Sequence, residues 1–490
     1  MIKLVTCMMI VSCAATAQER ADIDSIDRPE VPAIRDTLGN SFRASDTSLA
    51  DQTEVAVTIY NNNLALVKDR RKIALFPGEM TLQFKDVAQL IKPETVSMRS
   101  VSQPGALRII EQNYEYDLIG YEKLMEKYVG KDVKLINFSD SIGFTEKTAR
   151  LISYTQGRPI YQIGDEIFLN HPGSVVLPEI PDNLIAKPTL IWLLDNQGTD
   201  QEIEVTYLTE GIGWKSDYVV VYDEQKSEMD LDAWITLNNQ SGAAYVDARL
   251  KLVAGEVNRV RERGRSGVRM EAMALRSVAP QVQEESFAEY HLYTVPRKTT
   301  IRENQSKQIN LFSASDIEVG KVYEFRGQQR YYSSRFPTFA AEKVAAYLTF
   351  ENEEDNNLGM PLPGGIARVY QRDSEGDLQF SGEDRIDHTP KDETVRLRLG
   401  NAFDVVGERV QVDFRRVSQN ILESSYKITL RNHKETDIQV DVVEPIMGDW
   451  QILQSNHGHT KRDAGTAVFS IPVKADGEFV LEYRVQIRIR

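Results

Sequence analysis

Cysteine is nearly absent from this 490-residue chain. The two cysteines, Cys7 and Cys13, both lie close to the N-terminus. Cleavage after Ala17 would leave a mature protein without cysteine, which excludes disulfides, thiolate nucleophiles and cysteine-ligated zinc. The mature chain must then be stabilised by the burial of its apolar side chains.

Long apolar runs are also missing. The run from Leu4 to Cys13 is far shorter than the roughly 20 residues of a transmembrane helix, and no later segment reaches that length without charges. This run follows Lys3 and precedes Ala15-Thr16-Ala17, a pattern typical of a secretory signal peptide with its cleavage site. We therefore expect an exported protein, periplasmic or extracellular, with no transmembrane helix.

A second cleavage site is possible within the same segment. Residues 10–13, "IVSC", resemble a lipobox, which would place the cut before Cys13 and attach a lipid to it. We favour cleavage after Ala17, because a cut before Cys13 would leave an unusually short signal.

Basic residues are outnumbered by acidic ones. The chain has 58 Lys and Arg against 73 Asp and Glu, a formal net charge of −15. An acidic surface repels phosphate backbones, so we expect no nucleic-acid partner.

The chain lacks the common catalytic motifs. It has no G-x-S-x-G elbow and no phosphate-binding glycine loop that follows a strand and opens a helix. The glycines of "PLPGGI", residues 361–366, are bounded by proline and lead into a strand, so we interpret them as a turn. We assign no catalytic residue, no cofactor-binding residue and no metal ligand, and we expect no cofactor.

Strand-like alternation is what the chain has in quantity. Val55, Val57 and Ile59 alternate ahead of an Asn turn at 61–63, as in a hairpin. A helical spacing over 118–128, ending near Gly130, precedes five short strands, which predicts a small SH3-like or Sm-like barrel with one short helix. From Lys187 onward nearly all segments alternate and are separated by turns, which is typical of β-sandwiches.

The expected fold class is therefore mainly β and multi-domain, with β-sandwich (immunoglobulin-like) modules preceded by the small barrel. Residues 258–287 interrupt the strands with an Arg-, Gly- and Met-containing stretch that we expect to be mobile. The expected divisions are a signal peptide at 1–17, a flexible leader at 18–54, an N-terminal β-segment at 55–115, the barrel at 116–182, a sandwich at 187–413 and a C-terminal sandwich module at 414–490.

Three stretches in the last 300 residues carry a family resemblance. They contain "TEGIGWKSDYVVVYD", "FAEYHLYTVPRKTTIRENQ" and "LGMPLPGGIARVYQRDSEGDLQF", and "VTIYNNNLALVKDRR" occurs earlier in the chain. Together they resemble the bacterial family called domain of unknown function 4139 (DUF4139), which is related to the mucoidy inhibitor A-like proteins. The resemblance implies no reaction, cofactor or catalytic residue. In longer relatives a helical coiled-coil insertion separates the two parts, whereas here the small barrel occupies that place.

Histidine offers one candidate metal site. In a strand, His457 and His459 would face the same side and could bind zinc or copper with Asp449 or His433 as a third ligand. We favour a polar loop, because Gly458 lies between them and two histidines at this spacing are a weak pattern.

Two acidic stretches offer candidate cation sites. Residues 351–357, with Glu351, Glu353, Glu354, Asp355, Asn356 and Asn357, could ligate calcium, but we favour a solvated turn because the EF-hand register is absent. The second stretch contains Asp373, Glu375, Asp377, Glu383, Asp384, Asp387 and His388. We interpret it as a hairpin tip at 373–377 followed by a second charged connection. A cation site requires that these two loops meet around His388; if they point apart, the segment is a scaffold hairpin.

Two tryptophans could belong either to a core or to a binding surface. Trp214 lies between Gly211-Ile212-Gly213 and Tyr218, and Trp234 alternates with Ile235. We favour a core position for both, because their neighbours alternate as strand residues do.

Function follows only in outline. We expect an exported, noncatalytic cell-envelope protein that acts as a binding or structural module, with a protein or another envelope component as partner. The 258–287 segment is the candidate contact element. The alternatives are a metal-dependent hydrolase using His457 and His459, and a carbohydrate-binding envelope protein using an exposed Trp or Tyr. The sequence assigns no oligomeric state.

Overall fold

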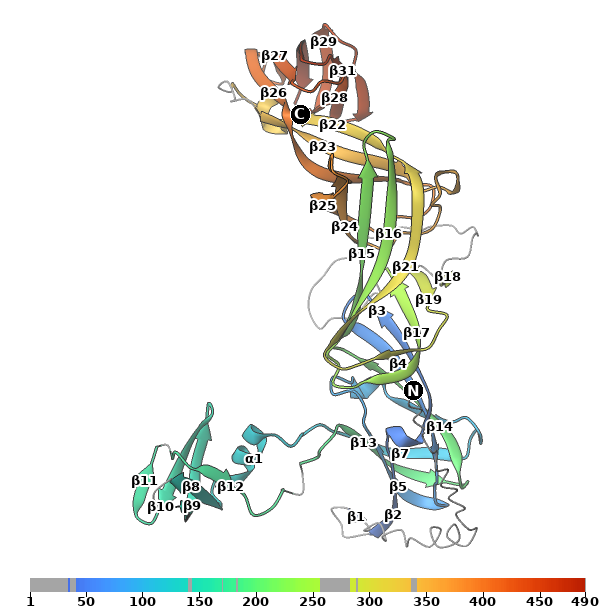
Figure 1. The fold of residues 1–490 in the computed structure, drawn as a ribbon, viewed down its shortest axis with the longest axis vertical. Coiled ribbons are helices and arrows are strands. Elements are labelled where there is room, and N and C mark those ends of the chain that lie inside the picture. The colour runs from blue at the N-terminus through green and yellow to red at the C-terminus, as the bar shows by residue number, and fades with distance from the viewer. Residues whose placement is uncertain are drawn as a thin grey trace, which may run out of the picture. The chain divides into compact units, whose positions relative to one another are not determined.

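The chain is built almost entirely from β-strands. The computed structural model describes residues 34–35, 41–139, 143–169, 171–181, 184–255, 283–287, 290–335 and 342–489. Over these ranges the chain forms 32 strands, one α-helix and four short 3-10 helices, and the strands make five sheets (Figure 1). The predicted mainly-β, multi-domain fold is confirmed. The described ranges contain no helix that is both long and apolar enough to cross a membrane.

The chain divides into two compact units. The first takes Met1–Asp51, Arg71–Asp86 and Arg99–Ile203, and the second takes Gln52–Arg70, Val87–Met98 and Glu204–Arg490. The first unit contains the sheet β1-β2-β5-β13-β7. Its strands are β1 Ile34–Arg35, β2 Ser41–Thr47, β5 Gly78–Lys85, β7 Leu107–Glu115 and β13 Thr189–Asn196.

The predicted flexible leader, residues 18–54, is corrected in part by this sheet. Strand β2 lies within the leader and pairs in parallel with β5, and β3 begins at Gln52. The sequence pattern of β2, "SFRASDT", carries few apolar residues, so its strand state depends on the hydrogen-bonding edge that β5 offers. Residues 18–33, and the predicted signal peptide at 1–17, lie outside the described residues.

A small domain is inserted between β7 and β13, two neighbouring strands of that sheet. The predicted helix is present as α1 Tyr121–Tyr128, and Gly130 follows it with a φ of +84°. Five strands follow, as predicted, in the order β11-β10-β9-β8-β12. They are β8 Asp132–Ser139, β9 Gly143–Thr155, β10 Arg158–Ile163, β11 Glu166–Phe168 and β12 Ser174–Val176.

The inserted domain has a core of its own but an open sheet. Met125 and Tyr128 of α1 pack on Val133, Leu151 and Tyr161 of the strands. Strands β11 and β12 form the two edges and do not pair with each other, so the sheet does not close into the barrel that the sequence suggested. These edge strands have only three residues each, too few for a long closing ladder.

The second unit begins with an eight-stranded sheet in the order β18-β19-β17-β3-β4-β14-β6, with β20 paired to β17. Its strands are β3 Gln52–Tyr60, β4 Leu64–Ile73, β6 Ser97–Ser100, β14 Gln201–Thr209, β17 Tyr245–Ala254, β18 Gln283–Phe287, β19 Tyr290–Thr294 and β20 Thr299–Ile301. The predicted hairpin over 55–73 is present as β3 and β4. Of the predicted mobile insertion at 258–287, residues 283–287 form β18, and the remainder lies outside the described residues.

The next sheet of this unit has five long strands in the order β21-β16-β15-β24-β25. They are β15 Ile212–Asp223, β16 Glu228–Asn239, β21 Gln305–Glu318, β24 Gly365–Arg372 and β25 Leu378–Ile386 (Figure 1). All neighbours are antiparallel except β15 and β24, which run parallel. Alternate residues such as Tyr218 and Val220 are fully buried, so one face of the sheet forms a core.

The last sheet has nine strands in the order β29-β32-β27-β26-β23-β22-β28-β31-β30. They are β22 Gly320–Arg326, β23 Glu342–Glu351, β26 Thr394–Ser418, β27 Ile421–Asn432, β28 Ile438–Pro445, β29 Asp449–Ser455, β30 Thr460–Asp463, β31 Thr466–Val473 and β32 Gly477–Arg488. The ring centroids of Phe469 on β31 and Tyr483 on β32 lie 5.0 Å apart although these strands are far apart in the order. The sheet therefore curls over a single core.

One boundary prediction can be compared with this sheet. The C-terminal strand β32 lies between β27 and β29. The boundary predicted between residues 413 and 414 falls inside the 25-residue strand β26, so the sheet takes strands from both sides of it. The immunoglobulin-like character of the modules stays a prediction.

Candidate functional site

The five-stranded sheet has a second face that is polar, aromatic and partly exposed. Side chains alternate along each strand, so residues at every second position share this face with their cross-strand partners. We call it the Trp234 face, and its residues are Lys215, Asp217, Val219 and Val221 on β15; Asp232, Trp234 and Thr236 on β16; Gln308, Asn310 and Ser313 on β21; Ile366, Arg368 and Tyr370 on β24; and Phe380 and Glu383 on β25.

Trp234 lies near the middle of this face. Its direct cross-strand partners are Asn310 on one side and Asp217 on the other. Trp234 is half-buried, whereas the neighbouring Ala233 and Ile235 point the other way and are completely buried. The predicted core position of Trp234 is therefore wrong: the tryptophan shares its face with Asp232 and Thr236.

Trp214 is in the core, as predicted. Its side chain is 4% exposed, its Nε1 donates a hydrogen bond to the Val253 carbonyl at 3.2 Å, and its ring meets Tyr293 edge to face. Trp192 and Trp450 are buried as well. Trp234 is therefore the tryptophan whose side chain reaches solvent.

A chain of side-chain hydrogen bonds crosses the face beside Trp234. Asp217 accepts hydrogen bonds from Thr236 Oγ1 at 2.8 Å and from Arg368 Nη1 at 3.1 Å. Arg368 also pairs with Glu383 at 3.3 Å, and Gln308 donates to Thr236 at 3.3 Å. This chain joins all five strands, so the polar groups around Trp234 are held in fixed positions.

Asp217 is the ionisable group at the centre of this chain. Its burial opposes ionisation, but the hydrogen bonds from Thr236 and Arg368 and the charge of Lys215 outweigh it, so the pKa of Asp217 is lowered. Asp217 is therefore a carboxylate at neutral pH, and it can accept hydrogen bonds but not donate them.

Aromatic side chains recur toward one end of the face. The rings of Tyr370 and Phe380 meet edge to face with centroids 5.7 Å apart, and Phe380 is 58% exposed. Val221 is the cross-strand partner of Tyr370 on β15. The face thus offers two aromatic positions, one at Trp234 and one at the Tyr370–Phe380 pair.

A hollow of about 630 Å³ adjoins that end of the sheet. Val221 and Asp230 line it, together with the β15–β16 turn and the start of the β24–β25 turn. Its charged lining residues are six carboxylates, at Asp223, Glu224, Glu228, Asp230, Asp316 and Asp373, and two cations, at Lys226 and Arg372. Lys226 and Glu228 also line a second hollow of about 640 Å³ that is again rich in carboxylates. The surroundings of this end are therefore strongly acidic.

The acidic stretch at 371–390 is a hairpin whose two charged parts lie at opposite ends. Asp373 accepts hydrogen bonds from the Gln379 side chain and from the backbone N–H of Glu375 and Asp377, which lowers its pKa. His388 lies beyond the other end of the nine-residue strand β25, where its Nδ1 accepts the N–H of Gly364. The two loops do not meet, so the segment is a scaffold hairpin.

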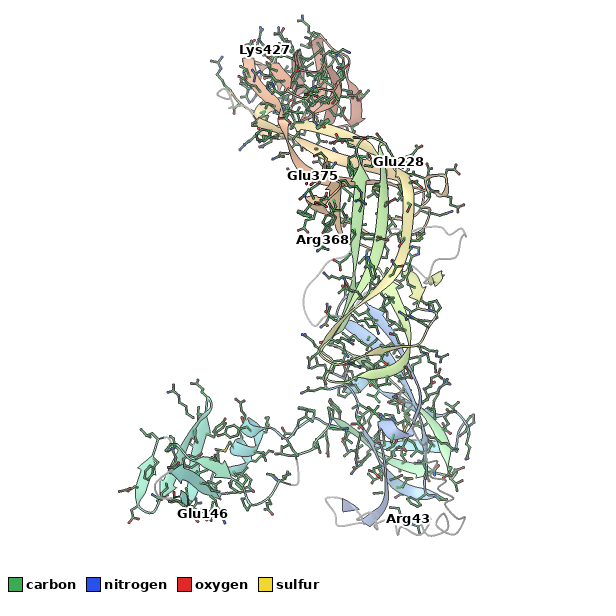
Figure 2. The ribbon with its side chains drawn as sticks, in the orientation of Figure 1. Arg43, Glu146, Glu228, Arg368, Glu375 and Lys427 are labelled. Carbon is green, nitrogen blue, oxygen red and sulfur yellow. The ribbon has the colours of Figure 1, made fainter. Side chains whose placement is uncertain are left out.

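Two of the carboxylates in this stretch belong to a strand and not to the predicted connection. Glu383 and Asp384 lie in β25, where they face Arg368 and Ala367 of β24. Figure 2 labels Arg368. Both residues of β25 are predicted from the sequence to lie in the second charged connection. Here Gly382 follows a register shift and approaches the Leu399 carbonyl closely, and β25 continues past it.

The predicted histidine site is not assembled as a metal centre. His457 Nε2 lies 2.9 Å from the Ser470 carbonyl, and the ring of His459 packs near Trp450 and Phe469. His433 is exposed, and Asp449 is exposed at the start of β29. In the described part of the chain, no three His, Cys, Asp or Glu side chains gather as metal ligands.

The predicted calcium loop is held by its asparagines. Asn356 is buried, accepts the N–H of Glu318 at 2.7 Å and donates to the carbonyls of Glu318 and Glu351. Asn357 adopts a φ of +57°, as is usual for asparagine in a turn. These amides anchor the turn, while the carboxylates of Glu353, Glu354 and Asp355 are exposed.

The sequence contained a signal for the Trp234 face that our interpretation did not use. In "LDAWITL", residues 231–237, the apolar set Leu, Ala, Ile and Leu alternates with Asp, Trp and Thr. Period-two alternation places Trp234 with the polar set. Other residues of the face, such as Asn310 and Arg368, lie at sequence separations that no local pattern connects to Trp234.

The sheets and this face define a mainly-β protein with a partly exposed aromatic and polar surface on a rigid sheet. The chain belongs to the family described as Domain of unknown function (DUF4139), which matches residues 203–489 and confirms the resemblance seen in the sequence. The match includes all strands of the Trp234 face. A comparison with curated proteins finds no match to this chain.

Proposed function

We propose that this chain is an exported, noncatalytic binding module of the cell envelope, and that the Trp234 face is its binding surface. The observation that carries the proposal is the half-buried Trp234 in the centre of a sheet face, surrounded by fixed hydrogen-bonding side chains. Binding sites combine such an aromatic contact surface with a few positioned polar groups.

The rigidity of the surface supports a binding role. All residues of the face lie on strands of one sheet, and the side-chain hydrogen bonds cross every strand pair. A site on regular strands keeps its geometry better than a site on loops, so less conformational entropy is lost when a ligand binds.

The ionisation of the face supports a noncatalytic role. A general acid or base needs a pKa near the working pH. Asp217 has a lowered pKa and is ion-paired with Arg368, and Arg368 is shared with Glu383. Asp217 therefore keeps its charge at neutral pH, which suits recognition better than proton transfer.

The leading segment supports export. The apolar run and the Ala15-Thr16-Ala17 site argue for a periplasmic or extracellular mature protein without cysteine. The same proposal includes a relation of this chain to the mucoidy inhibitor A-like proteins.

The test is a binding experiment with isolated bacterial cell envelopes. Wild-type mature protein should sediment with envelopes in a saturable manner. Trp234→Ser should weaken this binding about tenfold, because it removes one aromatic contact and its buried area. A tenfold loss of affinity corresponds to about 1.4 kcal/mol. Phe403→Ser is the matched control, since Phe403 is 81% exposed on a different sheet.

Circular dichroism and thermal unfolding show whether each variant is folded. Trp234 is only half-buried, so its replacement should leave the sheet folded. Envelope binding by folded Trp234→Ser that equals that of the wild type would overturn the Trp234 face as the binding surface.

A further inference from the structure

We infer that the Trp234 face binds a neutral oligosaccharide. The inference rests on the proposed function, because it names the ligand class of the same surface. Four features of the face carry it: the partly exposed aromatic ring of Trp234, the mixture of hydrogen-bond donors and acceptors beside it, the charges around it and the acidic surroundings at one end.

The aromatic ring meets the first chemical requirement of a sugar. A pyranose ring has an apolar side lined by C–H groups, and an indole offers a flat apolar surface of similar size. Trp234 stands on a regular strand between its partners Asn310 and Asp217, so its ring is flanked by polar groups on both neighbouring strands. A sugar lying on the indole would bring its rim of hydroxyls to the partly exposed Asn310 amide.

The neighbouring side chains meet the second requirement. Each sugar hydroxyl both donates and accepts a hydrogen bond, so a binding surface needs both kinds of partner. Arg368 donates, and the Asn310 and Gln308 amides both donate and accept. Asp217 and Thr236 are only 7% and 6% exposed, and they hold Arg368 and Gln308 in position beneath the surface. The existing bonds of Asp217, at 2.8 Å to Thr236 and 3.1 Å to Arg368, hold these groups in place before a ligand arrives.

The charges around Trp234 argue against a protein partner at this place. The buried cores of protein–protein interfaces are depleted of charged residues. Here the exposed charges of Lys215, Asp232 and Glu383 lie on the same face as Trp234. Covering these charges with an apolar partner would cost desolvation free energy, whereas sugar hydroxyls replace the water that they lose.

The electrostatics of the adjoining hollow select a neutral ligand over an anionic one. Six carboxylates and two cations line the hollow at the Val221 end of the face, and the whole chain carries a formal charge of −15. Uronates and phosphorylated glycans would be repelled by this field.

The two aromatic positions indicate a ligand longer than one sugar. Trp234 and Tyr370 are separated by two strand spacings across the sheet and four residues along it, a distance of roughly 16 Å. Several linked sugars are needed to span that distance. The exposed Phe380 beside Tyr370 would then contact only the far part of the chain.

The experiment measures the binding of defined oligosaccharides to the full mature protein by tryptophan fluorescence and calorimetry. The probes are disaccharides and hexasaccharides of neutral glucans, mannans, xylans and N-acetylglucosamine chains, with hexagalacturonate as the anionic counterpart. At least one neutral hexasaccharide should bind and displace the protein from envelopes. Trp234→Ser should weaken that binding at least tenfold, and Trp234→Phe should restore part of it.

The length argument has its own variant. Phe380→Ser should weaken binding of the hexasaccharide several-fold and leave the corresponding disaccharide unchanged. Phe403→Ser should change neither.

Each failure has a distinct meaning. If Trp234→Ser abolishes envelope binding but no neutral oligosaccharide binds or competes, the saccharide inference is overturned and the proposed function stands. If Trp234→Ser binds envelopes like the wild type, the proposed function fails with it. Hexagalacturonate binding as tight as that of every neutral hexasaccharide would overturn the preference for a neutral ligand.

Discussion

Arg409 and Glu444 form an ion pair in the core of the nine-stranded sheet, and each side chain is only 1% exposed. Arg409 Nη2 lies 2.5 Å from Glu444 Oε1, and Tyr332 donates to the other carboxylate oxygen. Burial alone would lower the pKa of Arg409, but the facing carboxylate outweighs it and raises that pKa. Arg409 therefore keeps its charge, and this buried charge depends on the Glu444 carboxylate beside it.

Removing one member of this pair should be far more damaging than removing both. Glu444→Gln leaves a buried guanidinium without its counter-charge and should lower the free energy of unfolding by about 3 to 5 kcal/mol. The double variant Arg409→Met with Glu444→Leu should recover most of this loss, because it buries no charge. Urea denaturation of the three proteins measures the difference.

A surface pair on the same sheet is the matched control. Glu408 pairs with Arg431 at 2.9 Å, and both are about one-third exposed. Glu408→Gln should cost at most about 1 kcal/mol, because solvent screens exposed pairs. If Glu444→Gln and Glu408→Gln lowered the free energy of unfolding equally, burial would not be the reason that the Arg409–Glu444 pair matters for stability.

At the scale of elements, the parallel pairing of β15 and β24 positions the Trp234 face. Ser216 and Gly365 are direct partners in this ladder. A Cβ atom built on Gly365 would lie 2.3 Å from the Ser216 carbonyl oxygen, so only glycine allows the two strands to approach this closely. Arg368 and Tyr370 lie farther along the same strand, so their positions depend on this contact.

Gly365→Ala should therefore separate the start of β24 from β15. We expect a loss of about 1 to 3 kcal/mol in unfolding free energy, as for overpacked sites, and faster amide hydrogen exchange in β24. Gly458→Ala is the control, because a Cβ at Gly458 meets nothing within 4 Å. Unchanged exchange in β24 of Gly365→Ala would show that the strand pair tolerates the methyl group.

At the scale of the whole molecule, the inserted domain is the most separable part. Its core cluster draws only on residues between Met125 and Leu177. The strands on either side of the insertion are neighbours, with Glu115 of β7 directly opposite Thr189 of β13. A short turn can therefore join them in place of the insertion, since closing a short loop costs little entropy.

Replacing residues 119–184 by a short Gly-Ser linker should leave the rest of the chain folded. The unfolding transition of the remaining sheets should keep its midpoint in urea, and the near-ultraviolet spectrum should keep the contributions of Trp192 and Trp234. Failure of this protein to fold would show that the insertion is needed to form the sheet of β7 and β13.

The sequence by itself determined the strand content, the single short helix with its glycine end, the family and the acidic charge. These follow from local patterns, such as period-two alternation in "LDAWITL" and helical spacing before Gly130. It also contained the alternation of apolar and polar residues that places Trp234 on the same side as Asp232 and Thr236. The prediction of a core position for Trp234 rested on its alternation with Ile235 and did not use this pattern.

Only the tertiary structure decided which distant segments share a face. The register of β21, β16, β15, β24 and β25 brings Asn310, Trp234, Asp217 and Arg368 together from across more than 150 residues. Cross-strand register depends on long-range pairing and packing, which no local pattern encodes. For the same reason the structure alone showed that the charged loops at 373–377 and around His388 lie apart, and that Arg409 and Glu444 meet in a core.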